Sequence, residues 1–229
     1  MKKSVVSFLF IALGLSCGFA KTWTNNIGVG VSVPFSKIEF EEKDNIKPDD
    51  ISQMGFAIES TYLGYHENGF TAKADYAFGV FTTDDVSIQG DTKNVGIGGN
   101  VDIGAGYSFI RNEKFTLATT LMFGLSFYSY FDHGTSDKDT ADEKEYDTVM
   151  ALCTLDLGAD IFASYRLSEH FGLFANLGIR YYPVGVSGSQ TDYEWKEGNT
   201  KYTKSDESDN YTLSGKYKIA PTLGVVWNF

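Results

Sequence analysis

Cysteine is nearly absent from this chain, and its scarcity excludes two classes of protein. The 229 residues contain two cysteines, Cys17 and Cys153. Cys17 lies in an N-terminal segment that we expect to be removed, so Cys153 stands alone in the mature chain. A single cysteine forms no internal disulfide and cannot supply a cysteine-based metal site. A disulfide-stabilised scaffold and a structural zinc site are therefore both excluded.

Proline, long apolar runs and positive charge are also scarce. Four prolines stand against 24 glycines, 18 phenylalanines and 14 tyrosines, which suits an aromatic-rich sheet better than a helical bundle. No stretch approaches the roughly 18 apolar residues of a membrane-spanning helix. Lysine and arginine total 19 against 30 aspartates and glutamates, giving a formal charge of −11. We expect no nucleic-acid partner, because such binding requires a basic face.

The first 20 residues have the layout of a secretory signal peptide. Two lysines precede an apolar stretch over residues 5–15, and Gly18 and Ala20 place small residues at the −3 and −1 positions of a cleavage site. The alternative is a lipoprotein signal, in which Cys17 would carry the lipid. Cleavage after Ala20 would leave residues 21–229 as one domain with a formal charge of −13.

Eight segments of the mature chain alternate between apolar residues and small or polar ones. A period of two indicates a β-strand with one apolar face. In the segment that ends the chain, apolar residues take odd positions from Leu213 to Phe229, with Ser214, Lys216 and Lys218 between them. All but the second segment reach the roughly 9–11 residues of a tilted membrane-spanning strand. The eight segments are 27–35, 56–62, 70–80, 95–109, 115–127, 149–165, 171–181 and 213–229.

The connections between these segments alternate in length. This alternation predicts an all-β fold, an antiparallel up-and-down barrel of eight strands that crosses a membrane. An exported chain without a membrane helix can span a membrane only as such a barrel. We expect both termini and the short turns to be periplasmic and the long loops to be extracellular. The short links are 66–69, 111–114 and 167–170, and the long polar ones span roughly 36–53, 82–93, 132–148 and 184–210.

Alternation alone leaves open which face of the sheet lies outside. A secreted lipocalin-like barrel would have its apolar face inside, but its water-facing wall should be dense in charge. The face opposite the apolar one is mostly Gly, Ala, Ser and Thr, which suits the narrow interior of an eight-stranded barrel. Its few charges nearly balance, so we expect them to pair inside the barrel. They are Glu59, Asp75, Asp102, Asp156 and Asp160 against Lys73, Arg180, Lys216 and Lys218.

Aromatic residues gather at both ends of the apolar face. Two aromatic girdles are typical of proteins whose outer wall crosses the two interfaces of a bilayer. We therefore expect the apolar face to contact lipid. The two sets are Tyr107, Phe109, Phe115, Tyr165, Phe171, Trp227 and Phe229 at the short-turn end, and Phe35, Phe56, Phe78, Phe127 and Tyr181 toward the loops.

The C-terminal alternation of Tyr217, Leu223, Val225, Trp227 and Phe229 is similar to the signal read by the outer-membrane assembly machinery. The whole mature chain resembles the small eight-stranded bacterial outer-membrane barrels of the OmpX/Ail and OmpW type. Its acidic composition, rich in glycine and aromatic residues, also resembles that of spirochaete outer-membrane proteins. The resemblance implies a location in the outer membrane, with lipid and the assembly machinery as partners.

Pro221 departs from the pattern of the last segment. Proline lacks the backbone N–H that a strand donates to its neighbour. We therefore expect a bulge or disturbed pairing between the last segment and the first.

The sequence gives little sign of catalytic or metal chemistry, so we expect no enzymatic activity, cofactor or metal. Residues 133–136, which begin with His133, could imitate the rim of lipid A-modifying barrels, but we favour an ordinary loop histidine. An acidic stretch in the same loop could offer oxygen ligands to calcium. It lacks the glycine turn and ligand order of an EF-hand, and we favour a solvated loop. This stretch comprises Asp137, Asp139, Asp142, Glu143, Glu145 and Asp147.

Larger side chains also fall on the inward register. They either plug the barrel or line a narrow apolar conduit, and we favour the plug because eight strands leave little interior space. We predict a structural role or a cell-surface interaction with an extracellular ligand, carried by acidic loops. The alternative, implied by the resemblance to OmpW, is a porin-like narrow channel for small hydrophobic molecules. The inward residues are Leu63, Phe81, Met122, Tyr128, Tyr130, Met150, Leu152, Phe162, Phe174 and Tyr182.

Overall fold

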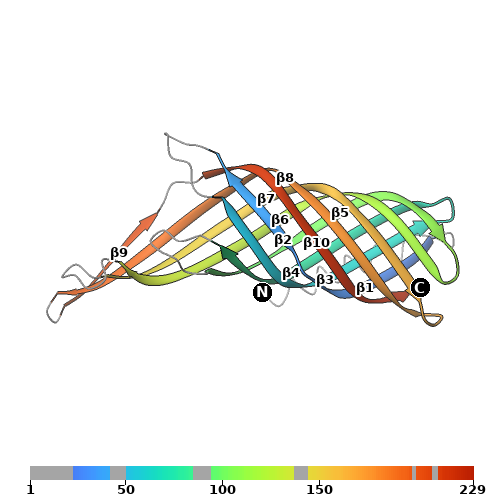
Figure 1. Ribbon diagram of the computed structural model, residues 1–229, viewed down its shortest axis with the longest axis horizontal. Helices are drawn as coiled ribbons and strands as arrows, with labels where there is room; N and C mark the ends of the chain where they lie inside the picture. Colours follow the sequence, from blue (N-terminus) through green and yellow to red (C-terminus); the bar gives the residue numbers. More distant parts are fainter. Residues whose placement is uncertain (1–22, 42–49, 85–93, 137–143, 198–199, 208–210) are drawn as a thin grey trace.

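The computed structural model describes residues 23–41, 50–84, 94–136, 144–197, 200–207 and 211–229. Residues 1–20, the expected signal peptide, lie outside these ranges. Within them, no helix is long and apolar enough to cross a membrane. Ten strands form one antiparallel sheet (Figure 1). They are β1 (Trp23–Ser32), β2 (Phe35–Phe40), β3 (Ile51–His66), β4 (Phe70–Asp84), β5 (Asn94–Arg111), β6 (Phe115–Ser136), β7 (Lys144–Arg166), β8 (Phe171–Glu197), β9 (Thr200–Glu207) and β10 (Tyr211–Asn228).

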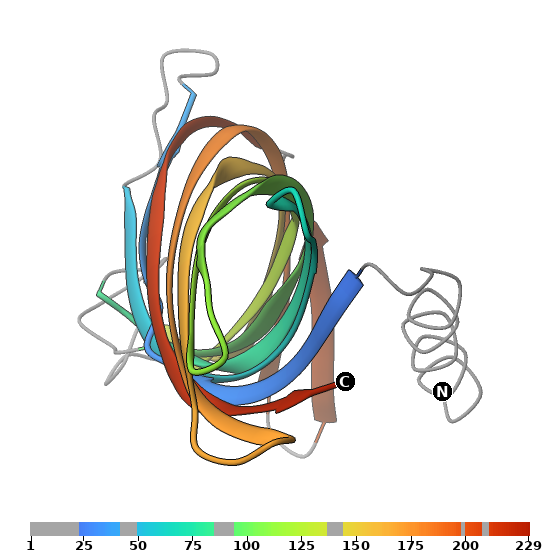
Figure 2. The same ribbon diagram turned by 90° about the vertical axis from the view of Figure 1, so that its right-hand side faces the viewer.

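Consecutive strands from β3 to β8 pair along the sheet, and the ends of the chain pair with each other. β10 pairs with β8 on one side and with β1 and β2 on the other. β1 and β2 in turn both pair with β3. Figure 2 shows the strands arranged around a common interior. The side chains of alternate residues therefore point either into this interior or away from it.

The interruption between β1 and β2 lies where two prolines face the seam between the first and last strands. Pro34 follows the end of β1, and Pro221 lies opposite on β10. The carbonyl of Pro221 accepts a hydrogen bond from the N–H of Val33 at 3.0 Å, and that of Pro34 accepts one from Gly55 at 3.1 Å. Since neither proline has an N–H to donate, the regular ladder stops here. The disturbance expected at Pro221 is therefore a break in the facing strand, which divides one predicted segment into two.

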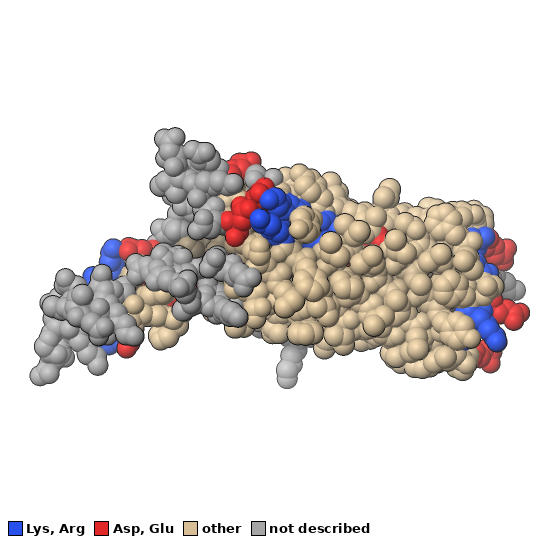
Figure 3. Space-filling model, viewed as in Figure 1, with Lys and Arg blue, Asp and Glu red and all other residues tan. Residues whose placement is uncertain are grey.

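The outer face of the sheet is apolar. Leu121, Leu223 and Phe56 are 75%, 70% and 63% exposed, whereas Thr120 and Thr222, next to the two leucines in sequence, are buried on the inner face. Figure 3 shows charged residues at the right-hand end and from the middle of the view toward the left, with a broad, almost uncharged surface between these two groups. The apolar face therefore lies outside, as the small residues of the opposite face predicted, and the lipocalin-like arrangement does not occur.

Several strands are longer than the alternating segments predicted. β6 and β7 remain paired from Asp132 with Thr148 out to Ser136 with Lys144, within the predicted 132–148 loop. The predicted 184–210 loop contains the end of β8 and all of β9, which pair with each other. We call this part of β6–β9, residues 132–136, 144–148, 184–197 and 200–207, the extension. In Figure 1 it reaches past the other strands at the end opposite the C-terminus.

The loop boundaries were wrong because the extension has no simple apolar face. Both of its faces carry polar residues, so the period of two in hydrophobicity disappears. Its threonines, tyrosines and tryptophan still favour strand backbone. Tyr146 and Tyr193 lie across from each other, with ring centroids 6.5 Å apart, and Trp195 stacks on Tyr202 at 5.6 Å.

Candidate functional site

The interior of the sheet is filled in three layers. Toward the short turns, a lower apolar cluster packs together. Toward the loops, a larger upper apolar cluster does the same. Between them lies an ionic layer of charged and hydrogen-bonding side chains. The lower cluster comprises Leu63, Tyr65, Ala118, Phe162, Phe174 and Val226, and the upper one Ile38, Phe40, Ile51, Phe81, Tyr128, Tyr130, Leu152, Tyr182 and Leu213, with Met150 packed against it.

Lys73 of β4 bridges two carboxylates of the ionic layer. Its Nζ donates hydrogen bonds to Asp75 on the same strand and to Asp160 on β7. The side chains of Lys73 and Asp160 are fully buried, and that of Asp75 is nearly so. β4 and β7 are not neighbours in the sheet, so this contact crosses the interior. Asp75 also accepts a hydrogen bond from Thr61 of β3 at 2.6 Å.

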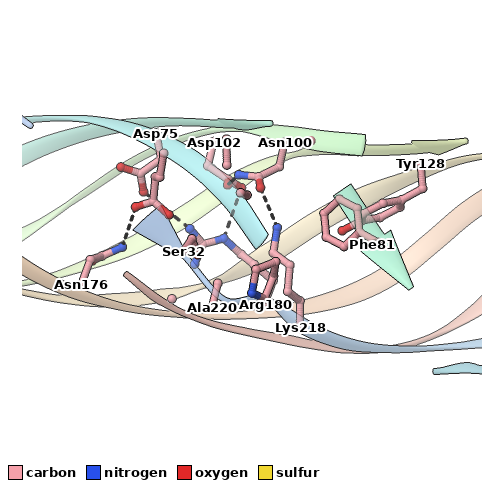
Figure 4. Close-up of a pocket in the computed structure, with 16 residues that line it drawn as sticks. Ser32, Asp75, Phe81, Asn100, Asp102, Tyr128, Asn176, Arg180, Lys218 and Ala220 are labelled. Carbon is pink, nitrogen blue, oxygen red and sulfur yellow. Dashed lines mark hydrogen bonds and ion pairs between the residues drawn. The ribbon is translucent and has the colours of Figure 1, made fainter. Parts of the chain in front are cut away.

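Arg180 of β8 joins three of the predicted carboxylates. Its Nη1 donates to Asp160 and its Nε donates to Asp102 of β5 at 3.2 Å. Its Nη2 lies 3.8 Å from Asp75 (Figure 4). The guanidinium has five donors in a fixed plane, so it can serve several carboxylates at once. Such buried pairs are retained only with full hydrogen bonding, because each charge has lost its hydration.

Lys218 of β10 forms the third cationic centre. Its Nζ donates to Asn100 of β5 at 2.9 Å and lies 3.9 Å from Asp156 of β7. Asp156 also accepts hydrogen bonds from Ser126 and, at 2.9 Å, from Thr154. The last strand is thereby tied across the interior to strands from the middle of the chain.

Glu59 of β3 belongs to the layer but has different partners. Its carboxylate accepts hydrogen bonds from Asn176 of β8 at 3.2 Å and from Thr222 of β10 at 2.8 Å. Within the part of the chain that the structure describes, no lysine or arginine nitrogen lies within 4.0 Å of this carboxylate. Glu59 therefore has neutral donors where the other carboxylates have cations.

The structure brings eight of the nine predicted charged residues together and separates Lys216. This lysine pairs with Glu39 and lies 3.8 Å from Asp50, with 31% of its side chain exposed. The register of β10 shifts between Leu213 and Gly215, whose φ is +102°. The shift reverses the alternation, so Leu213, predicted outside, is fully buried in the upper apolar cluster. A local bulge of this kind leaves no sign in a two-residue period.

A cavity of about 20 Å³ lies within the ionic layer, seen in Figure 4. Its walls include Glu59, Asp75 and Asp102, the cations Arg180 and Lys218, and several neutral residues. This volume accommodates about one water molecule or a small ion, and no organic solute. The sequence prediction missed the neutral participants in the layer. Their only sign in the sequence is that they occupy the same alternate, inward-facing strand positions as the charged residues. They are Asn100, Ser126, Thr154, Asn176 and Thr222.

His133 lies on the extension, on its solvent-exposed face. Its Nδ1 lies 2.7 Å from a carboxylate oxygen of Asp147 on β7, and both side chains are 70% exposed. This hydrogen bond, together with the charge of the carboxylate, raises the pKa of His133 above its ordinary value. Residues 137–143 of the predicted acidic loop lie outside the described residues. In the described ranges, no three His, Cys, Asp or Glu residues are placed to hold a metal ion.

The residues of the proposed assembly signal lie on the outer face near the end of the chain. Tyr217, Leu223, Trp227 and Phe229 are exposed and Val225 is half-buried. The backbone N–H of Phe229 donates to the carbonyl of Asn25 at 2.9 Å, which ties the last residue to β1.

The fold is similar to that of solved outer-membrane proteins, whereas sequence comparison gives no relatives. No protein-family model matches the chain, and no curated protein sequence matches it. Outer membrane protein OprG from Pseudomonas aeruginosa is 14% identical, with 91% of this chain and 97% of that chain covered and a TM-score of 0.57. Outer membrane protease OmpT from Escherichia coli is 12% identical over 91% and 97% of the two chains, with a TM-score of 0.45. The attachment invasion locus protein Ail of Yersinia pestis is 13% identical over 91% and 99%, with a TM-score of 0.41. The likeness to OprG places this all-β, antiparallel chain in the same fold as a solved outer-membrane protein.

Proposed function

We propose that this protein is an integral outer-membrane β-barrel of eight strands, close in type to the OmpX/Ail and OmpW barrels. In this count β1 and β2 form one barrel strand that is interrupted at Pro34, and β9 and β10 form another. The pairing of β10 with both β8 and β1 supports closure of the ring. The short turns and the termini would face the periplasm, and the extension would face the outside of the cell.

The observation that carries this proposal is the apolar outer wall. Leu121, Leu223 and Phe56 belong to a wall whose large apolar side chains remain exposed on every strand from β3 to β8. Soluble monomers rarely expose contiguous apolar patches beyond a few hundred Å². In a bilayer the same wall meets hydrocarbon at no hydrophobic cost, while the charges stay inside or at the ends. Lipid is therefore the first proposed partner, and the assembly machinery, acting through the C-terminal residues, is the second.

The filled interior supports a role as a scaffold rather than as a conduit. The upper and lower apolar clusters close the interior on both sides of the ionic layer, and the cavity between them has the size of one water molecule. We therefore favour a structural or cell-surface interaction role without enzymatic activity, carried by the extension and the acidic loops. The extension offers a rigid, solvent-facing sheet on which an extracellular ligand would bind.

Membrane insertion and orientation are tested together on intact cells. In an outer-membrane host, the protein should fractionate with the outer membrane and migrate faster on gels when unheated than when boiled. Added protease should cleave within residues 184–210 on intact cells and spare the turn at 167–170 until the cells are opened. Cleavage at the turn in intact cells would reverse the orientation, and recovery of a detergent-free soluble monomer would refute membrane insertion.

The alternative, a narrow channel for small hydrophobic molecules, has a separate test. Purified protein in planar bilayers should give no stepwise ion conductance, because both apolar clusters block the ionic layer. Uptake of small hydrophobic solutes by cells should be the same with and without the protein. A solute-specific uptake that depends on the protein would favour the channel over the scaffold.

A further inference from the structure

The ionic layer does not balance its own charge. Its ionisable side chains comprise five carboxylates and three cations, a formal excess of two negative charges. The layer lies between two apolar clusters that separate it from solvent. Uncompensated charge in such surroundings is costly, since a buried ion loses its hydration without gaining a partner. The carboxylates are Glu59, Asp75, Asp102, Asp156 and Asp160; the cations are Lys73, Arg180 and Lys218.

Among the described residues of the ionic layer, the carboxylate of Glu59 is the negative charge that has no contacting cation. Lys73 and Arg180 contact the carboxylates of Asp75, Asp102 and Asp160, and Lys218 lies beside Asp156. Glu59 receives hydrogen bonds from one amide and one hydroxyl, neither of which carries a charge. Its carboxylate is thus the member of the layer whose charge is met by no ion pair among the described residues.

The cavity beside Glu59 contains a second feature that points to a ligand. Asn176 lines the same cavity, is 5% exposed, and donates through its Nδ2 to Glu59. Its Oδ1 is buried and has no hydrogen-bond partner in the structure. A buried carbonyl oxygen needs a partner, because leaving it unsatisfied costs about 1–3 kcal/mol. A carboxylate without a contacting ion-pair partner and an amide oxygen without a donor therefore line one cavity, whose wall holds the carboxylates of Asp75 and Asp102 as well as the cations Arg180 and Lys218.

We propose that this cavity binds one monovalent alkali cation, held by the Glu59 carboxylate and the Asn176 Oδ1. Both groups are oxygen ligands, and a cavity of about 20 Å³ admits one such ion. A divalent ion usually takes several carboxylate ligands. Among the described residues, no three His, Cys, Asp or Glu side chains are placed to hold a metal ion, so a monovalent ion fits better. A water molecule would satisfy the Oδ1 but would leave the charge of Glu59 unbalanced.

The position of the ion gives it a structural consequence. Glu59 lies on β3 and Asn176 on β8, so the ion joins two strands that are not neighbours in the sheet, and Thr222 of β10 donates to the same carboxylate. A ligand that binds the folded state but not the unfolded chain raises the apparent stability. The protein should therefore be more stable in a salt whose cation fits the cavity than in one whose cation does not.

The test compares thermal unfolding of the full folded chain in detergent micelles in sodium chloride and in choline chloride at equal ionic strength. Choline is too large for the cavity and controls for screening. The unfolding temperature of the wild type should rise by about 4 °C at a sodium concentration ten times the dissociation constant, and should go on rising with the logarithm of the concentration. Glu59→Gln keeps the size of the side chain and one of its two acceptor oxygens, removes its charge, and should abolish the sodium-specific rise. Glu169→Gln, an exposed change in the 167–170 turn, should leave it intact.

Each outcome decides the proposal. Equal unfolding temperatures in sodium and choline for the wild type, at both pH 5 and pH 8, would overturn it and leave a proton or an ordered water in the cavity. A rise of the same size in Glu59→Gln would place the ion elsewhere and also overturn it. If Glu59→Gln does not fold, Thr222→Val removes one hydroxyl donor from the same carboxylate. The carboxylate then depends more on the ion, so the half-saturating sodium concentration should fall several-fold, and an unchanged value would overturn the proposal.

Discussion

At the scale of the residue, Asp160 is the carboxylate of the ionic layer that accepts hydrogen bonds from two cations. Lys73 from β4 and Arg180 from β8 both donate to it, and it is buried. Removing one partner of a buried ion pair leaves the other charge without compensation. The ionic layer is thus held by a few contacts of high individual cost, in contrast to the many small contacts of the apolar clusters.

Asp160→Ala should destabilise the protein strongly. We expect a loss of about 3–5 kcal/mol in the free energy of unfolding, because Lys73 and Arg180 lose a shared partner inside the sheet. Urea unfolding in lipid vesicles measures it. The exposed Glu169→Gln serves as the control and should change stability by less than about 0.5 kcal/mol. A loss of under 1 kcal/mol for Asp160→Ala would show that the layer is hydrated rather than buried.

His133 should titrate above the ordinary range of histidine. Asp147 favours the protonated imidazole, and the stabilising contribution of this pair is present below the unfolded pKa and is lost as the pH rises through the raised folded pKa. An NMR titration of the folded protein measures it. Asp147→Asn should lower the pKa of His133, whereas Asp206→Asn on β9 should leave it unchanged. A pKa of His133 that does not respond to Asp147→Asn would mean that the pair does not form in solution.

At the scale of the element, the backbone path of the last strand, β10, depends on one glycine. Gly215 has a φ of +102°, and an added Cβ would lie 2.9 Å from the carbonyl oxygen of Tyr182. The register shift at this residue turns Leu213 into the upper apolar cluster. A residue with a Cβ therefore opposes both the backbone angle and the packing.

Gly215→Val should destabilise the protein by about 1–3 kcal/mol more than Gly215→Asn does. Asparagine tolerates a positive φ better than a β-branched residue, while both side chains fill similar space. Urea unfolding of the two variants against the wild type gives the difference. If the two variants were equally stable, the bulge would not require this backbone conformation.

The strands also show how much of the fold could be predicted from the sequence. The two-residue period predicted the strands, the inner and outer faces and eight members of the ionic layer, because burial on a sheet follows residue parity. The alternation fails where the register shifts, so it misplaced Leu213. Lys216 lies on the continuous side of the shift, and its side chain pairs with the partly exposed Glu39 instead of joining the ionic layer. The alternation also fails where both faces are polar, so the strands of the extension were read as loops.

Neutral partners were the other omission at the site. Asn100, Asn176 and Thr222 lie on the inward register with the charges, but an amide or hydroxyl on a strand says nothing of which carboxylate lies across the interior. Strands that are distant in sequence supply these contacts, and pairing across the interior is set by the curvature of the whole sheet rather than by local pattern.

At the scale of the whole molecule, the direction of the apolar wall separates a membrane protein from a soluble one. Ile103 and Phe109 lie on the same outward face of β5 and are 61% and 63% exposed. Ile103 lies near the middle of the apolar span, and Phe109 near the turn that follows Arg111. In water these two positions would be equivalent. In a bilayer one lies near the midplane and the other at the interface.

Arginine substitution at these two positions therefore tests the environment of the wall. In lipid vesicles, Ile103→Arg should cost about 2–4 kcal/mol in the free energy of unfolding, because a charge at the midplane of the bilayer loses its hydration. Phe109→Arg should cost about 0–1 kcal/mol more than the loss of the phenyl ring itself, since its charge reaches the interface. Phe109→Ala and Ile103→Ala correct for the lost side chains. Equal and small costs for both arginines would mean that water, rather than lipid, surrounds the sheet.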